Sequence, residues 1–278
     1  MSRQAPGMTD PALRASESAQ ISLSDALAKI DRTIEPVAAR EIAPAEGLGF
    51  VLAADAVVAP ATKLRLAGAR LRTVDVALLA AHAVAHVSIR VPRIAVVAPS
   101  HHAEHAICAL IAGAIRAEGG AASVTHATLD EALKYPDYDA VIAIGEEAQI
   151  DQIVFDGVAL APGGATAFGN SNGRPLLRLS AEFDDALAGW LAIGRRLLAR
   201  LAFRLIEEQP FLLELARPIA SPRGLAQLIT VRRRAAQVEP VLGEWTPQSF
   251  SRSDGWILVP AESEGISAGT KVQMRPWP

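Results

Sequence analysis

Histidine and carboxylate side chains gather in one short segment of this chain, at residues 101–105. The segment reads His-His-Ala-Glu-His, so His101 and His105 would share one face of a helix, with Glu104 beside them. Imidazoles at that spacing could bind a metal ion, or could bind phosphate together with a helix N-terminus. The alternative is an exposed loop without chemistry, because no cysteine or second histidine pair is expected nearby. No metal is predicted; His101 and His105 are the candidate ligands, and His102 and Glu104 are candidate catalytic residues.

A second set of ionisable side chains follows residue 144. Glu146, Glu147 and Asp151 could form a carboxylate cluster for general acid–base catalysis or for binding Mg²⁺. Carboxylates in the first turn of a helix also complement the helix dipole without any further function. Both interpretations stay open, with Glu146 and Asp151 as candidate catalytic residues. A complete set of Mg²⁺ ligands is not evident from the sequence.

Glycines form a third set, in two neighbouring segments. Residues 162–164 read Pro-Gly-Gly, and residues 168–173 read Phe-Gly-Asn-Ser-Asn-Gly. Glycine-rich loops let backbone N–H groups approach a phosphate closely. The pair Asn172-Gly173 is also a strong signal for a two-residue β-hairpin turn. A phosphate cradle and a hairpin are therefore equally supported.

These residues need an α/β framework to position them. From Arg93 onward, apolar runs alternate with helical patterns, which predicts a mainly parallel sheet. Ligands of such sheets bind outside the carboxyl ends of the strands. The expected strands are residues 93–98, 121–126, 139–144, 157–161 and 175–180. The expected helices are residues 103–118, 129–134 and 182–206. The second follows the capping-box spacing of Thr128 and Glu131, and the third has a solvated face of Arg195, Arg196, Arg200 and Arg204.

Simpler patterns flank this framework. Before it we expect a helix at 21–30, a turn-rich joint at 60–68, and an apolar helix at 73–83 that packs on both sides. After Pro210, prolines, glycines and short β-branched runs predict a small β domain. Its expected strands are residues 211–215, 225–232, 236–242, 255–259 and 270–275. The expected domains are a disordered tail (1–20), an N-terminal α+β segment (21–91), an α/β domain (92–208) and a β domain (209–278).

Composition excludes several classes of function. The 278 residues carry a formal net charge of -3, so the chain has no general attraction to nucleic acid or to anionic membranes. Cys108 is the single cysteine, which fits a reducing compartment. The longest apolar stretch, residues 74–89, is interrupted by Asp75 and two histidines and is too short to span a bilayer. We therefore expect a cytoplasmic protein with no nucleic-acid or membrane partner.

Four passages, in this order, carry a family resemblance. They are SLSDAL with LGFVLAADAVVAP (22–27 and 48–60), AGARLRTVDVALLAA (67–81), DGVALAPGG with AFG (156–164 and 167–169), and SDGWILVPAESEGISAG (253–269). Together they resemble the molybdopterin molybdotransferase family, the MoeA and gephyrin E-domain proteins, over residues 21–278. The resemblance implies a central three-layer αβα domain similar to the MoaB/Mog pterin-binding fold, between the two flanking domains.

The chain departs from that family at the positions that carry its chemistry. The family's lasso domain would lie between Pro60 and Leu66, where only a short joint is present. Three loops that handle molybdate and the pterin phosphate in the family read APSHHAE (98–104), IGEEAQID (144–151) and LRLSAE (177–182) here. They have lost most of the family's aspartates and glycines. The chain thus resembles a truncated member with degenerate active-site loops.

The resemblance implies molybdopterin as the ligand and an elongated homodimer to which helix 73–83 contributes. The residues it gives for binding the cofactor are Ser100, His101, Gly145, Pro162, Gly163, Gly164 and Ser180. The expected function is a weakly catalytic or non-catalytic protein of molybdenum cofactor assembly, which binds molybdopterin or a partner in molybdoenzyme assembly. One alternative is an active molybdotransferase with a relocated site. The other is a structural or regulatory protein that binds no pterin, its crevice filled by side chains such as Arg178 and Glu182.

Overall fold

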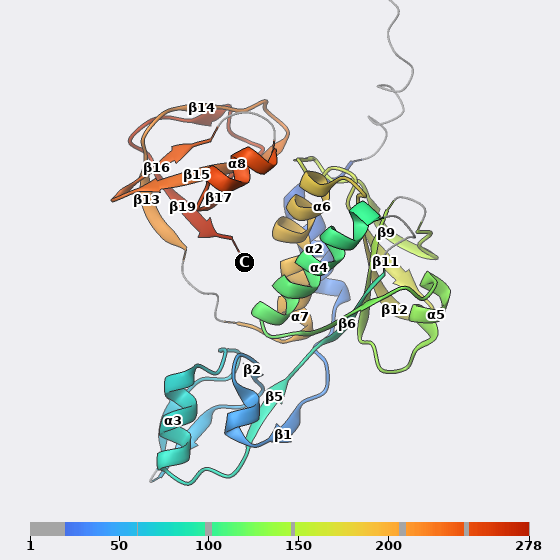
Figure 1. Cartoon of the computed structure of the whole chain (residues 1–278), viewed down its shortest axis with the longest axis vertical. Coiled ribbons are helices and arrows are strands. Elements are labelled where there is room, and N and C mark those ends of the chain that lie inside the picture. Colours follow the sequence, from blue (N-terminus) through green and yellow to red (C-terminus); the bar gives the residue numbers. More distant parts are fainter. Residues whose placement is uncertain are drawn as a thin grey trace, which may run out of the picture.

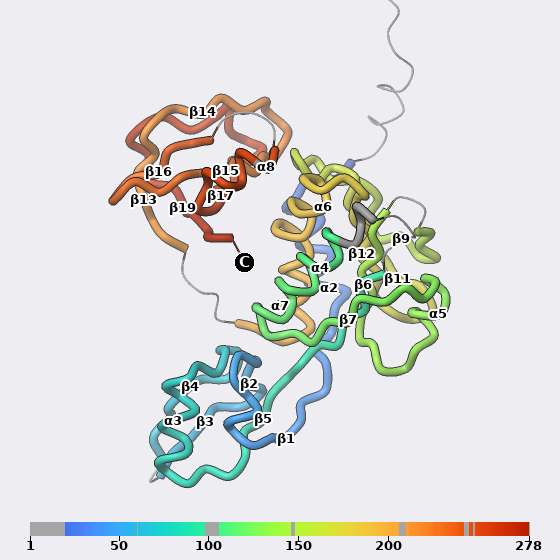
Figure 2. The backbone as a smooth tube through the Cα atoms, in the orientation of Figure 1, coloured from blue at the N-terminus to red at the C-terminus, as the bar shows by residue number. Residues whose placement is uncertain are grey.

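The computed structural model describes residues 20–59, 61–97, 102–145, 148–205, 210–241 and 245–277. These residues form three lobes: an N-terminal lobe in blue to cyan, a central lobe, and a C-terminal lobe in orange to red (Figure 1). The backbone passes between the central and N-terminal lobes twice, once before β1 (Arg40–Ile42) and once after β5 (Val87–Arg90) (Figure 2). Of the expected disordered tail, residues 1–19 lie outside the described part of the chain.

A six-stranded sheet forms the centre of the central lobe. In spatial order its strands are β7 (Ala121–Thr125), β6 (Arg93–Val97), β8 (Ala140–Ile144), β12 (Arg174–Leu179), β11 (Ala167–Ser171) and β9 (Gln152–Asp156). The first four are parallel, and β11 and β9 extend the sheet antiparallel. The predicted strand at 157–161 is not part of this sheet: only Leu160–Ala161 of that run form a strand, β10, and it belongs to another sheet. The edge strand of this sheet is β9, which is largely exposed and so lacks the apolar run that identifies a buried strand.

Helices cover both faces of this sheet. Alternate side chains of a strand point to opposite faces, and in β6 Ile94 and Val96 join one core while Ala95 and Val97 join the other. The first core is covered by α4 (His102–Ala117), α6 (Phe183–Gly189), the π-helical turn η2 (Trp190–Gly194) and α7 (Arg195–Leu201). The second is covered by α5 (Leu129–Lys134), which begins with the predicted capping box of Thr128 and Glu131. The three-layer αβα arrangement is therefore confirmed.

The arginines of the last predicted helix do not form the expected solvated face. Arg204 is 8% and Arg195 is 28% exposed, and both lie against Glu118.

Helix α2 (Leu23–Thr33) also covers the first core, although it lies within residues 21–91 of the expected N-terminal segment. Ser22 caps it by accepting a hydrogen bond from the Asp25 N–H at 3.0 Å. Leu23, Ala26 and Ile30 of its apolar face are buried in the central lobe. The N-terminal lobe proper therefore starts after α2. The other domain boundaries stay predictions.

The N-terminal lobe holds a three-stranded sheet, a hairpin and one helix. The sheet order is β1-β5-β2 (Val51–Leu52), and η1 (Pro44–Gly47) lies between β1 and β2. The expected joint at 60–68 contains β4 (Thr62–Arg65), which pairs with β3 (Ala56–Val58) as a hairpin. Helix α3 (Thr73–Ala81) is not packed on both sides, because Val74 is 52% and Leu78 is 40% exposed. Its expected contribution to a homodimer stays a prediction.

The C-terminal lobe is a β domain with one short helix. Its sheet order is β10-β15-β16-β13-β19-β17, and α8 (Pro247–Arg252) and the two-stranded pair β14–β18 complete it. The bounds of the strands are Phe211–Leu215 (β13), Ile219–Ala220 (β14), Ala226–Arg234 (β15), Gln237–Pro240 (β16), Gly255–Val259 (β17), Gly265–Ile266 (β18) and Lys271–Pro276 (β19). The edge strand β10 (Leu160–Ala161) comes from the central segment and pairs parallel with β15. Leu160 and Ala161 therefore join the C-terminal sheet, whereas the N–H groups of Gly157 and Val158 donate to the carbonyls of Thr166 and Gly164.

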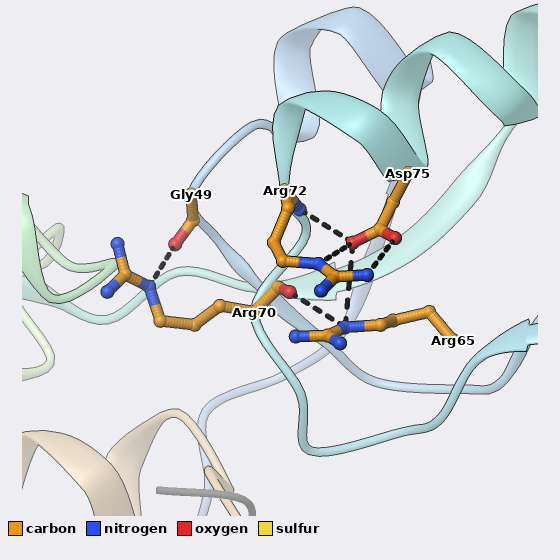
Figure 3. A network of polar contacts seen from close by, with 5 residues as sticks. All are labelled: Gly49, Arg65, Arg70, Arg72 and Asp75. Carbon is orange, nitrogen blue, oxygen red and sulfur yellow. Dashed lines mark hydrogen bonds and ion pairs between the residues drawn. The ribbon is translucent and has the colours of Figure 1, made fainter. Parts of the chain in front are cut away.

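Asp75 of α3 gives the N-terminal lobe a dependence on pH. Hydrogen bonds from the Arg72 side chain, at 2.9 and 3.0 Å, hold the pKa of this buried carboxyl below its ordinary value of 3.8 (Figure 3). Burial of the carboxyl opposes that shift. A lowered folded-state pKa contributes stability above the unfolded-state pKa, and the contribution disappears as pH falls through the folded-state value.

We expect Asp75→Asn to be less stable than the wild type at neutral pH, with a difference that shrinks as the pH falls below about 4. Urea unfolding at a series of pH values measures it. Asp130→Asn is the matched control, because Asp130 is 80% exposed and its ion pair with Lys134 at 3.8 Å is superficial. If the unfolding free energies of the wild type and Asp75→Asn differed by the same amount at every pH, the expected pH dependence would be contradicted.

Candidate functional site

The candidate site is the edge of the central sheet where the parallel strands β6, β8 and β12 end. Ligands of open α/β sheets bind outside this edge. Ser100, His101, Glu146 and Glu147 lie outside the described residues. His102, Glu104 and His105 fall in the first turn of α4, and the structure describes their backbone alone. Their candidate roles stay predictions.

Gly145 and Ser180 lie together at this edge, as the sequence predicts. The Gly145 N–H donates a hydrogen bond to the Leu179 carbonyl at 2.8 Å, which joins the ends of β8 and β12. Gly145 has φ +107°, a conformation that favours glycine. Ser180 is 5% exposed, and its Oγ accepts a hydrogen bond from the Glu182 N–H at 3.1 Å. Gly145 and Ser180 are therefore the first residues of the two loops that follow β8 and β12, and hydrogen bonds hold both loops at the strand ends.

The loop of Pro162, Gly163 and Gly164 is held by a carboxylate of its own chain. The Gly163 N–H donates to Asp185 Oδ1 at 2.5 Å, and the Ala165 N–H lies 3.4 Å from Asp185 Oδ2. Asp185 is in the first turn of α6. Backbone N–H groups that would cradle a phosphate are thus engaged by an internal anion. No local sequence pattern predicts this contact, because Gly163 and Asp185 are 22 residues apart in the chain.

The second glycine segment is a β-hairpin. Asn172 and Gly173 have φ of 51° and 71° and connect β11 to β12, so the hairpin interpretation is confirmed. The Asn172 N–H lies 3.3 Å from Asp151 Oδ2. This turn precedes β12, whereas Gly145 and Ser180 follow the carboxyl ends of β8 and β12. The structure therefore places Asp151 at the opposite edge of the sheet from the candidate site.

Arg178 lies on the face of the sheet that α5 covers and not across the strand ends. In β12 it alternates with Leu177 and Leu179, which join the other core. Its guanidinium makes an ion pair with Asp156 of β9 and donates to the Ala148 carbonyl at 3.3 Å. Arg178 therefore links β12 to the antiparallel edge strand β9 and does not fill the crevice at the strand ends.

The described residues hold neither a metal-binding cluster nor a membrane-spanning helix. Within the described part of the chain, no three histidine, cysteine, aspartate or glutamate side chains lie close enough together to hold a metal ion. None of the described helices is both long and apolar enough to cross a membrane.

Solved structures of the same shape are known. The molybdenum cofactor biosynthesis protein from Pyrococcus furiosus matches with a TM-score of 0.78 and 18% sequence identity, over 92% of this chain and 100% of its own. The molybdopterin biosynthesis MoeA protein from Pyrococcus horikoshii matches with a TM-score of 0.80 and 14% identity, over 93% and 100% of the two chains. No protein-family model matches the sequence, and neither does any curated protein. The chain therefore has the fold of the MoeA proteins, as the sequence passages indicated.

Proposed function

Proceeding from the MoeA fold, we propose that this chain binds molybdopterin at the carboxyl edge of its central sheet and assists molybdenum cofactor assembly with little or no catalysis of its own. Two structural neighbours are described as molybdenum cofactor or molybdopterin biosynthesis proteins. The observation that carries the proposal is that Gly145 and Ser180 begin neighbouring loops at the strand ends, which are joined by the 2.8 Å hydrogen bond from the Gly145 N–H to the Leu179 carbonyl. This is where an α/β sheet of this kind holds its ligand.

The residues at this edge fit the pterin phosphate in part. Gly145 has no side chain to obstruct an approaching phosphate, and Ser180 supplies a hydroxyl beside it. In the loop of Pro162, Gly163 and Gly164, the Gly163 N–H already donates to Asp185. It can donate to a phosphate only if that hydrogen bond breaks. Gly145 and Ser180 would therefore hold the phosphate, and the glycine loop would border the ring.

The placement of Asp151 supports binding without catalysis. It is one of four candidate catalytic residues, and it lies beside the hairpin turn at the other edge of the sheet. An active molybdotransferase with a relocated site is the second candidate function, and it would depend on His102, Glu104 and Glu146. Mg²⁺ would be needed there to neutralise the transferring oxyanions.

Titration of the full chain with molybdopterin, followed by pterin fluorescence, tests the proposal. We expect saturable binding that Gly145→Val weakens by about tenfold or more, since a Cβ blocks the phosphate and the backbone at φ +107° disfavours valine. Asp151→Asn is the matched control at the opposite edge and should bind as the wild type does. No binding by the wild type would leave a structural protein without a pterin, and equal weakening in both variants would contradict a site at the carboxyl edge of the sheet.

A second measurement distinguishes a protein that only binds molybdopterin from an active molybdotransferase. With molybdate and Mg²⁺ added to the pterin-loaded protein, we expect no more cofactor than in a protein-free control. Formation of cofactor that is lost in His102→Ala or Glu146→Ala would establish the relocated site in place of the carrier.

A further inference from the structure

The glycine loop at residues 162–165 lies at the same edge of the central sheet as Gly145 and Ser180. It leads into β11, whose first residue, Ala167, pairs with Arg178 close to the carboxyl end of β12. Because β12 runs parallel to β8, the loop stands at the edge where both strands end. It therefore borders the place at which the phosphate of a ligand is proposed to bind.

Hydrogen bonds within the loop and to the residues before it fix its shape. The Gly163 carbonyl accepts from the Thr166 N–H at 3.2 Å and from the Thr166 hydroxyl at 2.8 Å. The Gly164 carbonyl accepts from the Val158 N–H at 3.0 Å. Gly163 has φ +115°, a conformation that favours glycine. All three bonds join backbone or hydroxyl groups, so the loop keeps its shape whether or not Asp185 contacts it.

Asp185 of α6 places an anion against two N–H groups of this loop. Its Oδ1 accepts from the Gly163 N–H at 2.5 Å, and its Oδ2 accepts from the Ala165 N–H at 3.4 Å. Neighbouring backbone N–H groups around a glycine with positive φ form concave sites that hold the oxygens of phosphate groups. The carboxylate therefore stands where such an oxygen would bind.

The side chain of Asp185, and not the helix that carries it, can leave the loop. At the end of α6, Gly189 lies so close to the loop that a Cβ would be 2.3 Å from Thr166 Oγ1. At its start, the Phe183 ring packs edge-to-face against Phe250 of the C-terminal lobe, with the ring centroids 5.5 Å apart. Asp185 is only half-buried, so its carboxylate can rotate into water and release both N–H groups while α6 stays in place.

We propose that the contact between Asp185 and the glycine loop is autoinhibitory. The carboxylate occupies the N–H groups of Gly163 and Ala165, and a phosphate group at this edge can use them only after displacing it. A phosphate monoester carries about two negative charges near neutral pH, so the two anions exclude each other from the same pair of donors. The inference rests on the proposed function, since molybdopterin is the ligand whose phosphate would reach this edge. It adds that Asp185 keeps the affinity for that phosphate low.

The expected size of the effect follows from the share of molecules in which the loop is free. When a site is competent in only a fraction of the molecules, the apparent affinity falls by that fraction. A carboxylate that blocks the loop in about 90% of the molecules therefore weakens binding about tenfold. In the pterin fluorescence titration, Asp185→Ala should accordingly bind molybdopterin at least about tenfold more tightly than the wild type does. Far-UV circular dichroism checks that the variant keeps the fold.

A second readout reports on the loop itself. With inorganic phosphate as the probe, NMR of the isotope-labelled full chain should show saturable shifts of the Gly163 and Ala165 amide resonances in Asp185→Ala. The phosphate concentrations that cause them should leave the wild type unchanged. Asp184→Ala is the matched control, because it removes the same charge from the same turn of α6, and Asp184 accepts from the Asp185 N–H, at 2.9 Å. Equal gains in both variants would reduce the effect to net charge and overturn the proposal.

A third variant keeps the test decisive if alanine loosens the loop. Asp185→Asn retains the shape of the side chain and one acceptor oxygen without the charge, so it should bind molybdopterin more tightly than the wild type does. Unchanged or weaker binding in Asp185→Asn would overturn the proposal and leave Asp185 as a support of the loop.

This inference and the proposed function can fail separately. If no form of the protein binds molybdopterin, the proposed function fails. Phosphate-dependent shifts of the Gly163 and Ala165 amides in Asp185→Ala would then still establish the contact as inhibitory, and their absence would overturn it.

Discussion

Replacing Trp190 by alanine should destabilise the central lobe by about 3–5 kcal/mol, the range for removing a fully buried large aromatic side chain. Trp190 is 0% exposed and lies in the core shared by the sheet, α4 and α6. Its ring packs against Gly194, where a Cβ would lie 2.3 Å from the Trp190 ring atom Cε3. The π-helical turn η2 thus brings the tryptophan and the glycine together, and alanine at 190 would leave a cavity that the rigid sheet cannot close.

Urea unfolding followed by far-UV circular dichroism measures this loss. Trp190→Phe is the matched control, because it keeps an aromatic ring and removes an indole N–H for which the described residues offer no hydrogen-bond partner. We expect it to cost much less than alanine, since a buried unsatisfied donor disappears with the ring's outer atoms. Equal midpoints for wild type and Trp190→Ala would show that the central core does not depend on this ring.

Glu118→Gln should lower the free energy of unfolding by about 3 kcal/mol, because it removes the negative charge that Arg195 and the buried Arg204 share. Glu118 is 7% exposed, and Arg204, which it contacts at 3.1 Å, is 8% exposed. Arg195, at 2.7 Å, is 28% exposed and can turn partly towards water. Most of the lost stability would therefore come from Arg204, because its buried guanidinium would face a neutral amide instead of a carboxylate.

The same unfolding measurement compares this variant with Glu264→Gln. Glu264 pairs with Arg223 at 3.9 Å, and both side chains are more than 70% exposed. An exposed pair of that kind contributes about 0–1 kcal/mol, so its loss should be close to undetectable. Similar losses of unfolding free energy in Glu118→Gln and Glu264→Gln would mean that Glu118 and its arginines are as well hydrated as an exposed ion pair.

The sequence by itself determined the local elements of this protein. The strands at Arg93–Val97 and Ala140–Ile144, the capping box of Thr128 and the Asn172-Gly173 turn all formed where their patterns predicted. Such signals depend on side-chain alternation, one capping hydroxyl or one backbone conformation, all of which neighbouring residues fix. The four family-like passages likewise indicated the MoeA fold, because they span all three lobes in order.

Groups that are distant in the sequence are brought together by the packing of the lobes. Leu160 and Ala161 pair with the C-terminal sheet, Gly163 binds Asp185, and Asp151 lies at the edge of the central sheet opposite Gly145. Arg195 of α7 likewise binds Glu118 across 77 positions, and Arg196 binds Asp31 across 165. Contacts between residues so far apart depend on how the lobes pack, and local sequence periodicity does not predict that packing.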